Sequence, residues 1–251
     1  MPDATINGHK HHWEEGGTGE PLIMLHGAAS SGRGFYQHLP ELSKTFRVII
    51  PDMRGMGQSA HVETLDPPSA WSDDVEGLID HLGLGDVHLY GSSLGARVAL
   101  RVAIDRPQQV RTLILDNPIV LNEGAGNDAL NARMADPTKL PADAQERYRS
   151  QHGEDWAEVV RNYFVQRNEP ALQEHYNLRE LAKAVTIPTL LGRGDDIRDL
   201  VHPILHAVEL RHSLRNSKLW IKPEGGVFAT PEGYEVVRTF IATAAREPAT
   251  A

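Results

Sequence analysis

The chain contains no cysteine and no block of basic residues. The absence of cysteine excludes disulfides and catalysis by a thiol, and it leaves the redox compartment open. The formal net charge is −9, from 25 basic and 34 acidic side chains, which argues against nucleic acid or an anionic membrane as the main partner. The acidic balance otherwise predicts only that the protein is soluble, and the oligomeric state stays open.

Long apolar runs are also missing. None approaches the length that crosses a membrane, and the first ten residues lack the charged-then-apolar order of a signal peptide. We therefore expect a protein of the cytoplasm. With 251 residues, of which 40% are hydrophobic, the chain is long enough for one compact domain or for one domain with a small insertion.

Short apolar segments alternate with helical patterns along most of the chain. Strands are expected at 3–15, 21–25, 46–51, 86–91, 110–115, 187–191 and 218–221. Helices are expected at 34–42, 69–83, 93–105, 199–212 and 231–245. This order predicts an α/β fold, with a mostly parallel central sheet flanked by helices and ligands bound beyond the carboxyl ends of the strands. Between 118 and 185 amphipathic helical patterns replace the apolar strands.

One stretch has the pattern of a catalytic turn. A short apolar strand ends in Gly91-Ser92-Ser93-Leu94-Gly95, and an alanine-rich helix start follows. A serine in such a turn is held in a strained backbone conformation, and the two glycines leave room for strand and helix to pack closely. The turn presents the Ser93 hydroxyl at a helix N-terminus, where free N–H groups favour developing negative charge.

Two other polar segments are candidates for binding or metal sites. The glycine- and serine-rich loop that starts at His26 follows an apolar strand and is suited to present backbone N–H groups to a ligand. Alternation places His9 and His11 on one strand face and His12 on the other, and no carboxylate-rich segment accompanies them, which favours a solvated strand over a metal site. We predict no metal and no cofactor.

Four motifs, in this order, resemble those of the α/β-hydrolase superfamily over nearly the whole chain. They are Leu25-His26-Gly27, the run Asp52-x-Arg54-Gly55-x-Gly57-x-Ser59, the turn around Ser93, and residues 187–195. The resemblance implies a core made of residues 1–117 and 186–251, with a helical cap at 118–185. It also implies a hydrolase in which Ser93 is the nucleophile.

The resemblance further implies supporting roles. The backbone N–H groups of Ala28 and Leu94 would form the oxyanion hole, and His26 and Gly27 would support that loop. Asp195 would be the acid.

Two other carboxylates compete with Asp195 for that role. Asp196 competes because the preceding strand is one residue short of the usual pattern, and Asp116 because some members of the superfamily place the acid there. The alternative for Asp195 and Asp196 is loop capping or charge at a helix N-terminus.

The chain departs from the family at the base. Val227 occupies the position where the family usually carries the triad histidine, and no histidine follows His212. A serine is a poor nucleophile without a base to take its proton, and loss of the base costs on the order of 10⁶ in rate in serine hydrolases.

Several interpretations therefore stay open. The protein hydrolyses a small organic ester, lactone or carbon–carbon bond through Ser93 with a displaced base, for which His202 is the candidate; the alternative is a surface or helix-start histidine. Otherwise it is a catalytically degenerate member of the fold that binds a small molecule, with Val227 as an apolar wall, or one with lyase-like chemistry. A deliberate change at position 227 is a further alternative.

Overall fold

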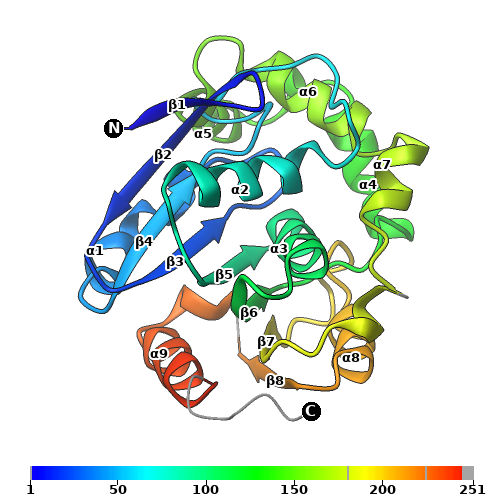
Figure 1. The fold of residues 1–251 in the computed structure, drawn as a ribbon. Coiled ribbons are helices and arrows are strands. Elements are labelled where there is room, and N and C mark those ends of the chain that lie inside the picture. Colours follow the sequence, from blue (N-terminus) through cyan, green and yellow to red (C-terminus); the bar gives the residue numbers. More distant parts are fainter. Residues whose placement is uncertain (1, 180, 224, 245–251) are drawn as a thin grey trace.

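The computed structural model describes residues 2–179, 181–223 and 225–244, and its centre is an eight-stranded sheet in the order β1-β2-β4-β3-β5-β6-β7-β8 (Figure 1). The expected strand at 3–15 is a hairpin of β1 (Asp3–Ile6) and β2 (His9–Gly16). Its turn residues Asn7 and Gly8 have φ of 51° and 80°, the conformation that an Asn-Gly pair favours.

From β4 onward the sheet is parallel. β2 pairs antiparallel with β4 (Phe46–Pro51), and from there β3 (Glu20–Leu25), β5 (Val87–Ser92) and β6 (Val110–Asp116) run parallel to β4. β7 (Thr189–Gly194) and β8 (Ser217–Lys222) continue the parallel part. The prediction of an α/β fold with a mostly parallel sheet is confirmed.

Alternate side chains of the strands build two cores, one on each face of the sheet. In β3, Ile23 and Leu25 pack on the face covered by α2 (Ala70–His81), α3 (Leu94–Asp105) and α8 (Ile204–Ser213). Leu22 and Met24 pack on the opposite face with α1 (Leu39–Leu42) and α9 (Glu232–Ala244). Residue 245, the expected end of the last helix, lies outside the described residues.

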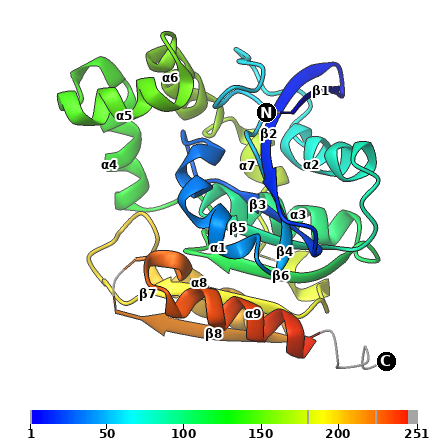
Figure 2. The ribbon, with the colours of Figure 1, turned by 90° about the vertical axis from the view of Figure 1, so that its left-hand side faces the viewer.

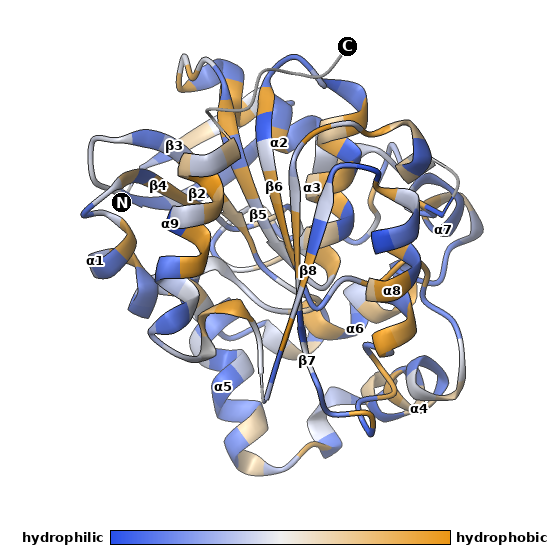
Figure 3. Cartoon of the chain, turned by 90° about the horizontal axis from the view of Figure 1, so that it is seen from below, coloured by the Kyte–Doolittle hydropathy of each residue, from blue (hydrophilic) through white to orange (hydrophobic). Residues whose placement is uncertain are grey.

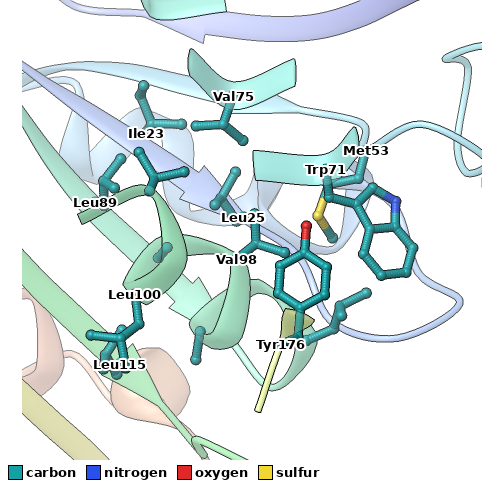
Figure 4. Close-up of a cluster of buried hydrophobic side chains, with 14 of the residues drawn as sticks. Ile23, Leu25, Met53, Trp71, Val75, Leu89, Val98, Leu100, Leu115 and Tyr176 are labelled. Atoms are coloured by element: carbon teal, nitrogen blue, oxygen red, sulfur yellow. The ribbon is translucent and has the colours of Figure 1, made fainter. Parts of the chain in front are cut away.

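The cores are apolar and closely filled. Figure 4 shows the first core, where Ile23, Leu25 and Leu89 of the sheet lie beside Val75 and Val98 of the covering helices. Burying each such side chain contributes about 1.5–3 kcal/mol. In Figure 3 the apolar colour follows the central strands, whereas α5 at the rim is mostly hydrophilic. The sheet is thus a rigid base for the loops at its carboxyl edge.

The stretch predicted as a cap contains four α-helices among its described residues. They are α4 (Ala125–Met134), α5 (Ala142–His152), α6 (Trp156–Gln166) and α7 (Pro170–His175). Short 3₁₀ turns are also present, η2 (Pro137–Lys139) and η3 (Leu181–Ala184). Figures 1 and 2 show α4, α5 and α6 gathered on one side of the sheet. The limits of the cap, 118–185, stay a prediction.

Two helices differ from the prediction. The expected helix at 34–42 is mainly a 3₁₀ helix, η1 (Gly32–His38), followed by the short α1. The helix expected at 199–212 begins only at Ile204, because Pro203 precedes it in an extended conformation (ψ 134°) and disfavours a helical residue 202. Residues 195–203 therefore form a loop at the carboxyl end of β7.

A test of the strand–turn–helix packing is Gly95→Ala. A Cβ on Gly95 would lie 2.2 Å from the backbone oxygen of Leu25, so strand or helix must shift. We expect the free energy of unfolding to fall by about 1–3 kcal/mol, measured in urea. Gly85→Ala is the control, since nothing lies within 4 Å of its Cβ position. Equal stability of the two variants would contradict the close packing.

Candidate active site

Ser93 occupies the turn between β5 and α3. Its φ of 54° and ψ of −110° lie in a region that residues other than glycine rarely adopt. The Ser93 N–H donates to the Asp116 carbonyl at 2.9 Å, and the Ser93 carbonyl accepts from the N–H of Ala96 at 3.1 Å. Hydrogen bonds on both sides therefore hold the strained turn.

A cavity of about 510 Å³ lies beside this turn, and three parts of the chain line it. The sheet and α3 contribute Gly27, Ala28, Ser92, Ser93, Leu94 and Arg97. The helical stretch contributes mainly apolar and cationic side chains, among them Leu130, Arg133, Met134, Tyr163, Phe164 and Arg167. The loop after β7 contributes Asp199, Val201 and His202.

His202 connects Ser93 to a carboxylate. Its Nε2 lies 2.9 Å from the Ser93 Oγ, and its Nδ1 lies 3.1 Å from Oδ2 of Asp199. An ionised carboxylate only accepts hydrogen bonds, so the ring proton belongs on Nδ1. Nε2 is then free to accept the hydroxyl proton of Ser93.

The loop that carries Asp199 and His202 is held from two directions. Oδ1 of Asp199 accepts hydrogen bonds from the N–H groups of Val201 and His202 at 3.1 and 3.0 Å, the local side-chain turn that aspartate favours. The buried Arg193 of β7 donates to the carbonyl oxygens of Gly194 at 2.8 Å and of His202. The imidazole therefore sits on a fixed backbone.

The charge of Asp199 is favoured by these contacts. Partial burial acts to raise the pKa of its carboxyl, but the side-chain and backbone hydrogen bonds of His202, and attraction to Arg193 and to the protonated form of His202, outweigh this effect. The pKa falls to about 2. Asp199 is thus ionised at neutral pH and suited to stabilise a protonated His202.

The carboxylates named from the sequence lie elsewhere. The side chain of Asp195 is exposed, and its N–H donates to the Lys222 carbonyl at 3.0 Å. Asp196 is exposed, and its carboxylate accepts hydrogen bonds from the backbone N–H and the side chain of Arg198. These contacts correspond to the loop-capping alternative for Asp196. None of the described hydrogen bonds of Asp195, Asp196 or Asp116 reaches the His202 ring.

Asp116 is buried behind the turn. Its Oδ2 accepts from the Tyr90 hydroxyl at 2.6 Å. Burial raises the pKa of Asp116, although the bonds from Tyr90 and the Val227 backbone oppose the rise.

Val227 belongs to the same buried region. It is 1% exposed and packs with Tyr90, Phe228 and α9 in the second core. Val227 is not among the described residues that line the cavity, so the expected apolar wall at this position is corrected: the side chain fills the core beneath the site.

The loop after β3 lies against Ser93. A Cβ on Gly27 would be 3.5 Å from the Ser93 Cβ, and Ala28 and Leu94 both line the cavity. The buried His26 accepts the N–H of Met53 at Nε2 (3.0 Å), so Nδ1 carries the proton and donates to the Gly27 carbonyl at 2.9 Å. Burial lowers the pKa of His26, which keeps the ring neutral in this bridge.

The sequence profile of the family described as alpha/beta hydrolase fold matches residues 20–196, more than half of the chain. The chain belongs to the α/β-hydrolase family. The resemblance inferred from the motifs is thereby confirmed.

Curated relatives in this family are hydrolases. The chain is 38% identical over 114 residues to a soluble epoxide hydrolase of Corynebacterium sp. (strain C12). This match covers 45% of this chain and 40% of that protein. It is 36% identical over 105 residues to a 2-hydroxymuconate semialdehyde hydrolase of Pseudomonas sp. (strain CF600), covering 40% and 37%. The matched part thus spans about two fifths of the length of these relatives.

Solved structures show the same fold over nearly the whole chain. Est816, described as an N-acyl homoserine lactone degrading enzyme, has a TM-score of 0.79 at 21% identity, covering 95% of this chain and 100% of that one. A thermophilic esterase from Thermogutta terrifontis has a TM-score of 0.77 at 22% identity, covering 97% and 98%. At these identities the likeness concerns the α/β-hydrolase fold alone.

Two further observations bear on the predicted partners. No helix in the described part of the chain is both long and apolar enough to cross a membrane. Within residues 2–179, 181–223 and 225–244, no group of three or more His, Asp or Glu side chains is placed to hold a metal ion.

Sequence reasoning named His202 but missed Asp199. The signal was the spacing Asp199-x-x-His202 followed by Pro203, which indicates a loop with an aspartate turn and not a helix start. It also missed Arg97 and Arg167, because each is an isolated cation within a helical pattern.

Proposed function

We propose that this α/β-hydrolase cleaves a small organic ester, lactone or carbon–carbon bond with a displaced triad of Ser93, His202 and Asp199. The 2.9 Å contact between Ser93 Oγ and His202 Nε2 carries the proposal. A serine hydroxyl becomes an efficient nucleophile when a positioned imidazole takes its proton, and here Asp199 orients that imidazole from its other nitrogen. Asp199 thus replaces Asp195 as the proposed acid.

The steps of the reaction follow from these contacts. As Ser93 Oγ attacks the substrate carbonyl carbon, its proton passes to Nε2 of His202, and Asp199 stabilises the resulting imidazolium. The carbonyl oxygen gains negative charge, which the backbone N–H groups of Ala28 and Leu94 are proposed to stabilise as the oxyanion hole. His202 then protonates the leaving group, and water, deprotonated by His202, releases the acid product and restores Ser93.

The displaced base removes the main argument for a degenerate protein. Binding or lyase-like roles were open because Val227 cannot accept a proton. A histidine from the loop after β7 supplies an acceptor in contact with Ser93. Curated relatives that share this family are hydrolases, which supports the same reaction class.

The first test removes the nucleophile and the base. Ser93→Ala and His202→Ala should each lower kcat/KM for p-nitrophenyl acetate by about 10⁴–10⁶, because the attacking oxygen or its proton acceptor is lost. Ser93→Ala should also abolish labelling of the folded protein by a fluorophosphonate. His212→Ala is the matched control, since His212 is exposed on α8, and it should keep wild-type activity.

Two results would count against the proposal. If the folded wild-type chain is neither labelled at Ser93 nor active on esters, the binding alternative is favoured. If His202→Ala keeps full activity, another group serves as the base.

The second test separates the two candidate acids. Asp199→Asn keeps the shape of the side chain but removes the charge that orients and stabilises protonated His202, so kcat should fall by about 10³–10⁴. Asp195→Asn should stay near wild type because that side chain is exposed and none of its described hydrogen bonds reaches a triad member. Steady-state kinetics on the same ester decides, and the reverse order of effects would restore Asp195 as the acid.

The third test concerns the usual histidine position. Val227→His places a larger, polar ring in a fully packed core, so the free energy of unfolding should fall by about 1–3 kcal/mol. Activity should not rise above wild type, because His202 already contacts Ser93. A large gain in kcat/KM on this substitution would mean that the native chain lacks a working base.

A further inference from the structure

Two buried arginines face the cavity beside Ser93. Arg97 of α3 and Arg167 at the end of α6 both line it, and each is only 3% exposed. Arg133, which is exposed, lines the same cavity. Among the described lining residues the sole acidic side chain is Asp199, which is engaged with His202. The cavity therefore carries an excess of positive charge.

The described partners of the two guanidinium groups are neutral. Nε and Nη2 of Arg97 donate to the Tyr176 carbonyl at 2.9 and 2.7 Å, and Nη2 of Arg167 donates to Oδ1 of Asn127 at 2.6 Å. Nε of Arg167 is buried without a hydrogen-bond partner among the described residues. Buried charges are normally paired with an opposite charge, because taking an ion out of water costs several kcal/mol.

The two cations also act on each other. Burial, with a smaller contribution from the charge of Arg167, lowers the pKa of Arg97 to about 10. Arg97 stays charged at neutral pH, and an anion between the two groups would relieve both the burial and the repulsion.

Neighbouring groups fix the position of both side chains. The guanidinium of Arg167 lies 5.2 Å from the Phe164 ring centre, and that of Arg97 lies 5.9 Å from the Tyr176 ring centre. Arg97 is four residues after Ser93, in the first turns of α3, and helical side chains lean toward the N-terminus of their helix. Its guanidinium thus extends toward the end of the helix that holds Ser93.

The positive cavity contrasts with the whole chain. The protein has a formal net charge of −9, so an excess of cationic side chains at one cavity is a local feature. An acidic surface repels anions in general, whereas a cationic cavity attracts those small enough to enter.

We propose that Arg97 and Arg167 bind a carboxylate of the substrate, so that the bond cleaved at Ser93 belongs to a small carboxylate-bearing molecule. This inference rests on the proposed hydrolase function. Guanidinium groups match carboxylate oxygens with paired hydrogen bonds, and the apolar lining around Leu130 and Met134 suits a short carbon chain.

The first experiment compares two esters that differ in charge and otherwise only by one methyl group. The wild-type enzyme is assayed with mono-p-nitrophenyl glutarate and with its methyl ester, which share the leaving group and the carbon chain. We expect kcat/KM to be about 10–100-fold higher for the free acid, the range of a buried charge-assisted hydrogen bond. Equal values for the two esters would overturn the carboxylate site while leaving the proposed triad intact.

Variants of the two arginines test whether they cause the preference for the free acid. Arg167→Gln should bring the ratio of the two kcat/KM values toward one, and Arg97→Lys, which keeps the charge but loses the fork, should lower it. Arg161→Gln is the matched control, because Arg161 is an exposed residue of α6 outside the cavity, and the ratio should stay at the wild-type value. An unchanged ratio in Arg167→Gln would contradict its role.

Binding without catalysis separates the two proposals. Calorimetry of Ser93→Ala with glutarate should show saturable binding that is lost in the Ser93→Ala, Arg167→Gln double variant. If neither ester is cleaved but this binding is present, the hydrolase proposal fails and the arginine site stands. Absence of glutarate binding, or binding of inorganic phosphate alone, would overturn the carboxylate assignment.

Discussion

The strained backbone at Ser93 is the constraint on which the site depends. A φ of 54° is held because strand and helix meet at this residue without intervening side chains: a Cβ on Gly91 or Gly95 would lie 2.2 Å from a backbone oxygen. The close packing of strand and helix places the Ser93 hydroxyl at the N-terminus of α3, beside the loop of Gly27 and Ala28. Every other group in the cavity is useful only because that oxygen is fixed.

Much of the fold could be predicted because it depends on patterns that local chemistry imposes. Continuous apolar runs such as 21–25 indicate strands buried on both faces, and Asn7-Gly8 indicates a tight hairpin turn. The serine turn is equally local, since two glycines and a strand–helix boundary define it. These features need no knowledge of distant contacts.

The proposed base, His202, reaches Ser93 through a contact between distant parts of the chain, whereas the local spacing Asp199-x-x-His202-Pro203 indicates only the loop that carries it. His202 lies 109 positions from Ser93 along the chain, and it reaches the hydroxyl because Pro203 delays the start of α8 and Arg193 holds the loop carbonyls. The apparent helical periodicity of 199–212 led to the prediction of a helix where residues 199–203 form a loop. Expecting the acid directly after the strand likewise drew attention to Asp195, whose side chain is exposed.

With the proposed base on this loop, the support of the proposed triad differs from that of the usual family arrangement. Asp199 and His202 are three residues apart, so one short loop sets both the imidazole and its carboxylate, and the buried Arg193 anchors that loop to β7. Under this proposal position 227 needs no catalytic group, and Val227 packs in the second core. Asp116 is buried with Tyr90 as a hydrogen-bond donor, and its pKa is raised because the effect of burial exceeds the opposing hydrogen bonds and positive charges. The proposed base thus lies on the loop after β7 instead of the last loop of the sheet, and its position depends on Arg193 and Pro203.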